Sequence, residues 1–307
     1  MMEQKNNFFL NKNANNPNKV NQSDKVSIIC KKTCLFTNAR DEKHILEWAA
    51  HHLLIGFNRI IIFDHKSEKP LKKVFKNFDK RVNIVNVSYL ENPIKMALMN
   101  KAAEIAAKLK IDWMIYLDAD EFIILNKKYR GIKHFLSIYN HADSLAINWL
   151  MFGSNYLEKD PDGLIVENYT KSDLFLNDHV KSFVRPNRVI DATNPHYYNM
   201  IDKLRYFNIN NQILKDNYHS NILNIEFYKV PIYIAHYVYQ SEETFLKRKV
   251  ILPRDDNGEH RRFDSDDDNK AKFIHNYHNI HENLYPKNEY AEGIQNFLQQ
   301  YSKSNTT

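Results

Sequence analysis

The sequence is poor in glycine and cysteine, and it has no long apolar run. Six glycines in 307 residues exclude a collagen-like chain or one dominated by flexible linkers. No apolar stretch approaches the roughly 18 residues of a transmembrane helix, and the N-terminus lacks the apolar core of a signal peptide. We therefore expect a soluble protein without a transmembrane anchor, cytoplasmic, or in a host cytoplasm or virion if the Asn- and Lys-rich composition reflects a virus.

Cys30 and Cys34 are the only cysteines in the chain. If they lie four residues apart on one strand, their Cα atoms are separated by roughly 13 Å. A disulfide needs a separation below about 7 Å. No second pair of cysteines is present to complete a zinc site. We therefore expect two buried free thiols in a reducing compartment.

The net charge of +6 is concentrated at the N-terminus. Six lysines in residues 1–32, against one Glu and one Asp, account for +4 of it. Residues 1–22 are rich in Asn and Lys without apolar periodicity, which predicts a disordered tail. The remainder is close to neutral, and this argues against nucleic acid as a partner, because such binding needs a basic stripe on a structured surface.

The chain also lacks a G-x-G-x-x-G or Walker A loop, which removes the main support for a dinucleotide or P-loop site. Its first half instead alternates short apolar runs with amphipathic stretches, the pattern that builds a parallel sheet. Asp41 is expected to cap the first helix and Gly56 to end it. Strands are predicted at 33–37, 59–63, 82–87 and 113–117, and helices at 41–54, 71–78 and 93–109.

From residue 144 the pattern becomes richer in strands, and from 241 it becomes helical and charged. The further strands are predicted at 144–149, 163–166, 181–185 and 230–234. The predicted fold class is therefore α/β, with a mixed, mainly parallel sheet flanked by helices. The expected organisation is a tail at 1–22, a main domain at 23–240 and a helical C-terminal extension at 241–307 that ends in a loose tail.

Asp118-Ala119-Asp120 directly follows the apolar strand 113–117. Ionised carboxylates avoid desolvated sites unless a partner compensates them, and oxygen clusters of this kind suit Mg2+ or Mn2+. Ligands of parallel sheets bind beyond the carboxyl ends of the strands, where residues 37–42 and Asp64 are also expected. The convergence predicts a metal-assisted nucleotide site, whereas an acidic turn that caps the next element is the plainer interpretation.

An ordered series of short motifs resembles the glycosyltransferases of the GT-A fold, in particular the family 2-like and family 92-like enzymes. The likeness spans roughly residues 34–250, and each piece is weak alone. The matching pieces are Asn38-Ala39-Arg40-Asp41-Glu42, Leu46-Glu47-Trp48, His51-His52, Gly56, Ile62-Phe63-Asp64, Trp113, Asp118-Ala119-Asp120-Glu121-Phe122, Trp149-Leu150-Met151-Phe152-Gly153-Ser154, Lys181-Ser182-Phe183-Val184-Arg185-Pro186, Pro195-His196-Tyr197, His236-Tyr237, Ser241-Glu242-Glu243 and Lys247.

Two pieces depart from the family pattern. Asp64 is followed by His65-Lys66-Ser67 instead of Asn-x-Ser. Residues 250–254 replace the arginine-glycine pair that usually follows the later lysine. The first departure affects the expected contact with the nucleotide, and the second affects the loop on the acceptor side.

The resemblance implies an inverting glycosyltransferase that moves a sugar from a nucleotide-sugar donor, with a UDP-sugar favoured, to a hydroxyl group of a glycan or protein-linked glycoconjugate. Asp118 and Asp120 would hold Mn2+ or Mg2+, which stabilises the leaving diphosphate. His196 or His236, one at most, would join the metal, since imidazole also suits Mn2+. Glu121 would hold the neighbouring backbone. The oligomeric state stays open.

Donor contacts and the catalytic base are less determined. Each of these contacts has an alternative. Asp64 would instead be a turn or cap residue, Asn100 a solvated helix residue, and Lys181 and Arg185 partners in surface ion pairs. An inverting enzyme also needs a carboxylate that deprotonates the acceptor hydroxyl, and the sequence does not choose among the candidates. The donor-binding residues are predicted as Thr37, Asn38, Arg40, Asp64, Asn100, Asp118, Lys181 and Arg185, and the candidate bases as Glu158, Asp160, Glu167 and Asp173.

Two other functions remain open from the sequence. A non-catalytic nucleotide-sugar or carbohydrate-binding protein would share the fold, although the intact Asp118 and Asp120 argue against it. A metal-dependent nucleotidyltransferase is less favoured, because residues 37–42 contain no glycine, whereas such an enzyme needs a glycine-rich loop after its first strand.

Overall fold

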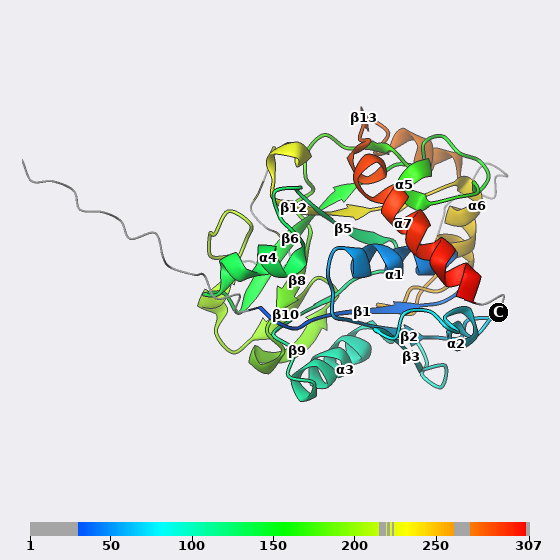
Figure 1. The fold of residues 1–307 in the computed structure, drawn as a ribbon. Helices are drawn as coiled ribbons and strands as arrows, with labels where there is room; N and C mark the ends of the chain where they lie inside the picture. Colours follow the sequence, from blue (N-terminus) through cyan, green and yellow to red (C-terminus); the bar gives the residue numbers. More distant parts are fainter. Residues whose placement is uncertain (1–29, 215–218, 220–221, 223, 261–270, 305–307) are drawn as a thin grey trace, which may run out of the picture.

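The computed structural model describes residues 30–214, 219, 222, 224–260 and 271–304. The tail expected at 1–22 lies outside these residues. The first half of the chain forms the parallel part of a nine-stranded sheet, in the order β3-β2-β1-β4 (Figure 1). Its strands are β1 (Thr33–Ala39), β2 (Arg59–Asp64), β3 (Val82–Asn86) and β4 (Trp113–Tyr116), and its helices are α1 (Ile45–Leu54), α2 (Leu71–Val74) and α3 (Lys95–Lys108).

The second half extends the same sheet in the order β8-β6-β12-β5 beyond β4. Strand β8 is antiparallel to both β4 and β6, whereas β12 is parallel to β6 and antiparallel to β5. The sheet is therefore mixed and mainly parallel, as predicted. Its further strands are β5 (Glu121–Leu125), β6 (Ser144–Met151), β8 (Val180–Val184), β11 (Tyr206–Phe207) and β12 (Ile232–His236).

The remaining elements surround this sheet. Two small antiparallel pairs join β9 (Val189–Asn194) to β10 (Tyr197–Met200) and β7 (Lys171–Ser172) to β13 (His281–Glu282). The other helices are α4 (Ile132–Leu136), α5 (Ile165–Asn168), α6 (Glu242–Phe245) and α7 (Tyr285–Ser304), with a π-helix at Leu246–Ile251 and 3-10 turns at Ser137–Tyr139, Pro186–Arg188, Lys203–Arg205, Phe227–Lys229 and Lys272–Asn276.

Alternate residues of β1 face two separate apolar layers. Leu35 packs with α1 on one face, and Phe36 packs with α3 on the other (Figure 1). Trp48 and Trp113 are fully buried in the core. Cys30 and Cys34 are buried free thiols, also as predicted, and burial raises the pKa of Cys30 to about 12. This two-sided burial explains why β1, β2 and β4 read as nearly continuous apolar runs.

Three local predictions were wrong. Helix α1 begins at Ile45 after His44, so Asp41 is not its N-cap; the Asp41 carboxylate accepts the N–H of Glu68 instead. The helix predicted at 71–78 is only the short α2. Residues predicted as a strand at 163–166 belong to a turn and to α5, because the buried Glu47 carboxylate accepts the N–H groups of Ile165 (2.7 Å) and Val166 (3.1 Å). Gly56 does follow the end of α1 with φ +105°, as expected.

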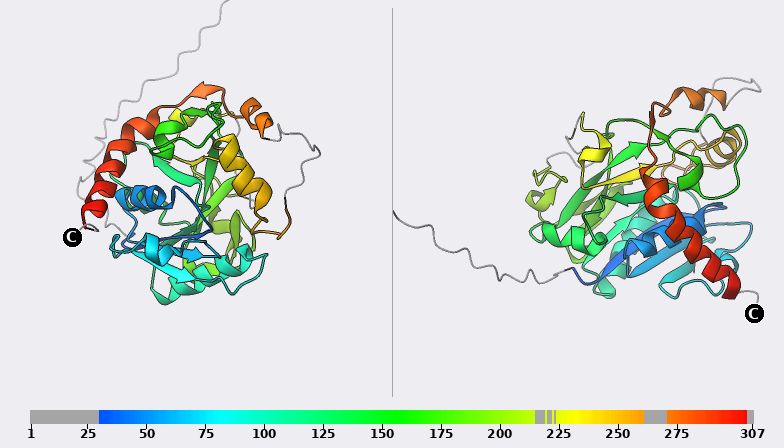
Figure 2. Two further views of the ribbon diagram at one scale, coloured as in Figure 1. Left: turned by 90° about the vertical axis from the view of Figure 1, so that its right-hand side faces the viewer. Right: turned by 45° about the horizontal axis from the view of Figure 1, so that its top comes forward.

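Helix α7 packs against α1 (Figures 1 and 2). Ile294 is fully buried in the main core, and the Tyr290 hydroxyl donates to the Leu125 carbonyl of β5 at 3.1 Å. The expected helical C-terminal segment is present and packs directly on the first helix of the chain. Within the described ranges, no helix combines the length and apolar character of a membrane span.

Candidate functional site

A charged cleft of about 260 Å³ opens at the carboxyl ends of β1 and β4 and extends to β6, β8 and β12. The parallel topology brings these ends to one edge of the sheet, which is where polar loops were expected to converge. Basic and acidic side chains line it in nearly equal number. The basic residues are Arg40, Lys95, Lys181, Arg248, Lys249 and Arg254, and the acidic ones are Glu42, Asp118, Asp120, Asp255 and Asp256.

Asp118 is held between two lysines. Lys95, at the start of α3, forms an ion pair with one carboxylate oxygen, and Lys181, on β8, lies 3.0 Å from the other. Both ammonium groups are almost completely buried. Burial alone would raise the pKa of Asp118, but Lys181 and Lys95 outweigh it and hold the pKa well below its usual range. Asp118 is therefore an ionised carboxylate in a fixed orientation.

Asp120 is paired from a different direction. Arg248 lies 3.1 Å and Lys249 3.5 Å from its Oδ2 atom, and both come from the π-helix at Leu246–Ile251. Arg248 also contacts Glu42 at 3.1 Å. Burial disfavours the charged carboxylate, yet Lys249 and Arg248 lower the pKa of Asp120 far below its usual value. Arg248 and Lys249 lie 128 and 129 positions beyond Asp120 in the chain. With Asp120 and Glu42 they form a group of two positive and two negative side chains.

Glu121 supports the motif from behind. Its Oε2 atom accepts the backbone N–H of Asp118 at 2.9 Å, as predicted for a residue that holds the neighbouring backbone. It is fully buried, and burial together with the nearby aspartates raises its pKa to about 8 despite Lys181 at 3.7 Å. Burial and the two aspartates thus disfavour a third negative charge beside the motif.

The motif and its histidines suit a divalent cation. His236 Nε2 lies 3.7 Å from Asp120 Oδ1, and burial lowers the pKa of His236 to about 4, so its imidazole is neutral. Its buried Nδ1 has no hydrogen-bond partner among the described residues. A carboxylate oxygen and a neutral imidazole nitrogen are good ligands for Mn2+. Asp120 and His236 therefore fit such an ion after small shifts. Among the described residues, the ligand atoms of Asp118, Asp120 and His236 do not all lie within 4.8 Å of one another.

His196 also lines the cleft, but its Nδ1 atom lies 3.0 Å from the Val180 carbonyl oxygen. Burial and the nearby Lys181 lower the pKa of His196 to about 3. Trp149 separates the two histidines, with its ring centroid 5.0 Å from that of His196 and 4.4 Å from that of His236. Of the two, His236 has the geometry that suits a shared ion with Asp120.

Of the predicted donor contacts, Asn38, Arg40, Asp118 and Lys181 line the cleft. Asn38 donates to Asp255 at 2.5 Å and accepts from Lys95 at 3.2 Å, so it links the end of β1 to the loop after the π-helix. Arg40 has a buried Nε atom without a hydrogen-bond partner among the described residues.

The other predicted donor contacts lie outside the lining of this cleft. Thr37 is buried and donates to the Asn38 carbonyl oxygen. The Asp64 carboxylate accepts the N–H of Leu71 (2.8 Å) at the start of α2, which is the cap that was weighed as its alternative. Asn100 pairs with both backbone groups of Ala192 and so ties α3 to β9. Arg185 donates to the carbonyl oxygens of Ala142 and Asn140.

None of the four predicted bases lines the charged cleft. Asp160 lines an adjoining cavity of about 550 Å³, which shares Glu42, Ala119 and Arg248 with the cleft. There Asp160 forms an ion pair with Lys43 at 2.9 Å. The remaining three point elsewhere: Glu158 is exposed, Glu167 accepts from Gln295 at 2.7 Å, and Asp173 contacts His278 at 2.8 Å.

Sequence reasoning missed several residues that the structure brings to the motif. Lys95 follows Pro93, which predicted the helix start but not the face on which its lysine lies. Glu42 stood inside a family-like motif without a role. Arg248 and Lys249 directly follow Lys247, which did match the family series, so the family motif already indicated this part of the chain.

Comparison with known proteins adds a family to this geometry. The model of the family described as glycosyltransferase family 92 matches residues 25–272. A glycosyltransferase family 92 protein of Oryza sativa subsp. japonica is 26% identical over 198 residues, which cover 61% of this chain and 33% of the relative. One of Ricinus communis is 26% identical over 196 residues, covering 61% of this chain and 35% of the relative. The chain thus spans about a third of the length of these relatives.

Solved structures give more distant likenesses. HddC from Yersinia pseudotuberculosis has a TM-score of 0.34 at 12% identity, covering 58% of this chain and 90% of that one. A nucleotidyl transferase from Methanothermobacter has a TM-score of 0.29 at 7% identity, covering 51% of this chain and 72% of that one.

Proposed function

Because the chain belongs to glycosyltransferase family 92, we propose that it transfers a sugar from a nucleotide-sugar donor, with a UDP-sugar favoured, to a hydroxyl group of a glycan or glycoconjugate. The observation that carries this proposal is the cleft itself. Two ionised aspartates at the end of a buried strand face four basic side chains, and the cavity between them is open. Such a site suits the diphosphate of a donor, which needs cationic partners and a fixed position.

The chain's own residues supply positioning. Lys95 and Lys181 keep Asp118 ionised and oriented from two different elements. Arg248 and Lys249 carry positive charge beside Asp120. On donor binding they would leave the Asp120 carboxylate and pair with phosphate oxygens instead. When bound by Asp120 and His236, Mn2+ or Mg2+ would supply further positive charge that stabilises the leaving diphosphate. Trp149 gives the cleft an apolar wall of the kind on which a sugar ring packs.

An inverting transfer also needs a carboxylate that accepts the proton of the acceptor hydroxyl. We assign Asp160 as the first base to test, since it alone among the four candidates lines a cavity that adjoins the motif. Its ion pair with Lys43 at 2.9 Å holds the carboxylate at the wall of that cavity. Acceptor would then enter through the larger cavity and donor through the charged cleft.

The proposal is tested by incubating the full chain with a panel of UDP- and GDP-sugars, with and without Mn2+, and measuring released nucleoside diphosphate. We expect release that depends on the metal and is lost in Asp120→Asn. Asp162→Asn is the matched control, since Asp162 is an exposed acid in the loop that carries Asp160. Thermal stabilisation by donor without any release would instead favour a non-catalytic binding protein. Equal release by Asp120→Asn and wild type would contradict the assignment of the cleft.

A further inference from the structure

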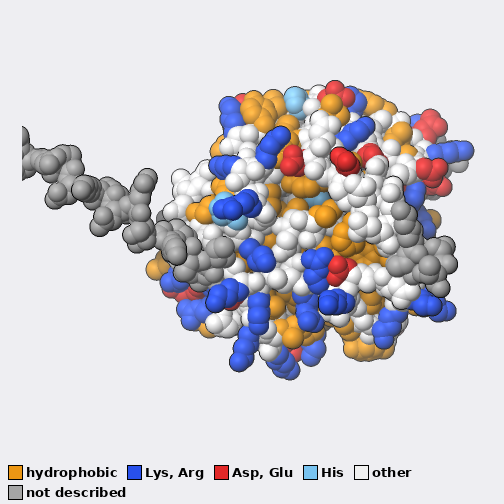
Figure 3. Space-filling model, in the orientation of Figure 1, with side chains coloured by type: hydrophobic (Ala, Val, Ile, Leu, Met, Phe, Trp, Pro, Cys, Tyr) orange, Lys and Arg blue, Asp and Glu red, His pale blue; other side chains and the backbone are white. Residues whose placement is uncertain are grey.

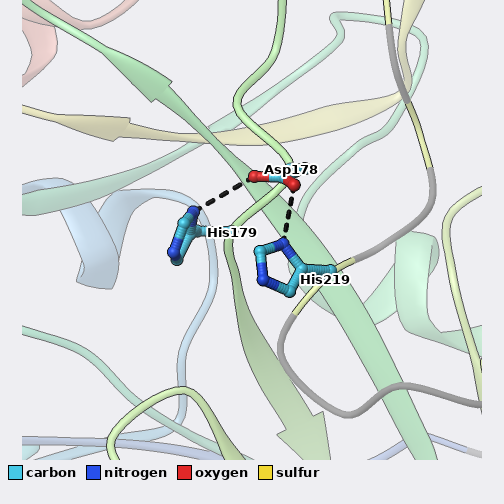
Figure 4. Close-up of side chains that lie close together, drawn as sticks. All are labelled: Asp178, His179 and His219. Carbon is cyan, nitrogen blue, oxygen red and sulfur yellow. Dashed lines mark hydrogen bonds and ion pairs between the residues drawn. The ribbon is translucent and has the colours of Figure 1, made fainter.

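A second group of metal-type ligands lies outside the cleft, in the segment that leads into β8. Asp178 Oδ2 lies 2.6 Å from His219 Nδ1, and Asp178 Oδ1 lies 3.1 Å from His179 Nδ1. Figure 4 shows both imidazole rings turned toward the one carboxylate. Each of the three side chains offers one ligand atom, and these atoms lie within 4.8 Å of one another. Within the described residues, this is the one group of three His, Cys, Asp or Glu side chains with that property.

The backbone at Asn177 and His179 is held by the main sheet. The His179 carbonyl oxygen accepts the N–H of Trp149 at 3.0 Å, and the Asn177 N–H donates to the Trp149 carbonyl at 2.8 Å. His179 and His219 face one another as an isolated antiparallel bridge. Two segments 40 residues apart therefore present their imidazoles to the same carboxylate through backbone pairing as well as through side-chain contacts.

Two imidazoles and a carboxylate form a donor set suited to transition metals such as Zn2+. Nitrogen and oxygen ligands bind Zn2+ at about 2.0–2.2 Å, so neighbouring ligands of a tetrahedral ion lie roughly 3.3–3.5 Å apart. The present separations of 2.6 and 3.1 Å reach that spacing by small side-chain movements. His179 Nδ1 would give up its contact with Asn177 Oδ1 at 2.9 Å. The three side chains are about one-third exposed, so an ion has access from solvent.

We propose that Asp178, His179 and His219 bind one divalent transition-metal ion, with Zn2+ as the probe, at a site distinct from the charged cleft. Three protein ligands leave a coordination position open to water or another oxygen ligand. The proposal does not rest on the proposed glycosyltransferase activity, because it uses none of the residues assigned to that reaction.

The structure also provides an optical reporter for this site. The His179 ring stacks on the Trp149 indole, with centroids 5.7 Å apart and an interplanar angle of 11°. Trp149 and His196 line the charged cleft, and the His196 ring lies 5.5 Å from that of His179, so the proposed site borders the cleft. The other two tryptophans, Trp48 and Trp113, are fully buried in the core. A paramagnetic ion bound beside His179 is therefore expected to quench Trp149 most strongly.

The test uses the full chain carrying Asp120→Asn, which removes a competing ligand in the cleft. After chelator treatment, Zn2+ binding is measured by equilibrium dialysis. We expect one ion per chain, with affinity reduced at least about 10–100-fold in His219→Gln and in Asp178→Asn, as even outer-shell partners have effects of this size. His141→Gln is the matched control, since His141 is an exposed histidine bonded to Asn211 away from the group; it should bind as the parent does.

Co2+ provides a second readout that reports the ligands themselves. Binding at this site should produce the visible absorption bands of a nitrogen-ligated ion and quench tryptophan fluorescence, and both signals should disappear in Asp178→Asn. Near-ultraviolet circular dichroism checks that each variant is folded; if His219→Gln is not, the nearly isosteric Asp178→Asn decides the question. Failure of the parent to bind Zn2+, or equal binding by parent and Asp178→Asn, would overturn the proposal, whatever the outcome of the donor assays.

Discussion

Two regions of the molecule surround aspartates with cations, and only one of them forms a cleft. In the first, Asp118 and Asp120 each contact two basic side chains. In the second, Asp143, just before β6, lies 3.0 Å from Arg188, 3.1 Å from Arg205 and 4.0 Å from Arg185. Asp120 and Asp143 are both buried and ion-paired, so charge compensation alone does not distinguish a binding site from a structural ion-pair cluster.

The difference lies in what else the cations do. In the Asp143 group the backbone also pairs, since Asp143 donates to the Arg205 carbonyl and Arg185 donates to the Asp143 carbonyl, both at 2.9 Å. Arg185, predicted as a donor contact, further packs its guanidinium 4.5 Å from the centre of the Trp113 ring. In the cleft the pairs join side chains across an open cavity. A ligand is able to replace these side-chain pairs of the cleft without disrupting the fold.

The largest expected difference between the two regions is in catalytic activity. Asp120→Asn should lower sugar transfer by about 10²–10³-fold or more, the range seen when a group that stabilises developing charge is lost. Asp143→Asn should leave the turnover number within about twofold at a temperature where the variant is folded. Steady-state rates with a saturating donor measure both. Similar losses in the two variants would show that the distinction drawn between the two regions is false.

The next test separates Lys181 from Arg185, which sequence analysis grouped together. Lys181→Met should weaken binding of the nucleoside diphosphate by about 10–100-fold, since hydrogen bonds between charged groups contribute about 1.5–3 kcal/mol. Arg185→Met should leave this affinity unchanged, because its guanidinium faces Asp143 and Trp113. Titration calorimetry in the presence of Mn2+ gives both dissociation constants, and a weaker affinity in Arg185→Met would return that residue to the donor site.

Stability should show the opposite pattern. Asp143→Asn is expected to lower the free energy of unfolding by about 1–2 kcal/mol, because it leaves three arginines without their shared anion while the amide keeps the shape of the carboxylate. Urea denaturation followed by circular dichroism measures the change. The exposed Asp162→Asn serves again as control and should remain within about 0.5 kcal/mol of wild type. An unchanged stability in Asp143→Asn would mean that this cluster contributes nothing to the fold.

The smallest expected effect is that of salt. Arg188 and Arg205 are 38% and 42% exposed, so their attraction to Asp143 is partly screened by ions. At 1 M salt the Debye length is about 3 Å, and the stability difference between wild type and Asp143→Asn should shrink by about 0.5 kcal/mol. Repeating the urea titrations at low and high salt measures this. A difference that grows with salt would contradict the electrostatic origin of the cluster.

The parallel half of the sheet was predictable because its signals are local. Apolar runs predicted β1, β2 and β4, and Asp118 directly after the last of these runs predicted the carboxylate pair at a strand end. The hydrogen bond from the Asp118 backbone to Glu121 spans only three residues, so it too followed from the motif. Short-range patterns of this kind need no knowledge of how distant segments pair.

The rest of the site depends on contacts that no local pattern encodes. Whether Arg248 reaches Asp120 is decided by the position of the π-helix, 128 residues along the chain. The interleaved order β8-β6-β12-β5 is likewise set by pairing among distant strands. Residues 163–166 show a tertiary contact that overrides local preference, since Glu47 draws the N–H groups of Ile165 and Val166 into a helical turn.

Helix α7 sets a limit on how this protein is able to fold during synthesis. The family match ends at residue 272, yet Tyr285–Ser304 covers α1, and Tyr290 lies against His51 with ring centroids 4.7 Å apart. A nascent chain that has emerged only as far as residue 284 leaves this face of α1 open to water, because Ile294 and the rest of α7 have not yet emerged. The family-matched region and the stretch of chain that shares the main core are therefore of different lengths, because α7 completes the core beyond residue 272.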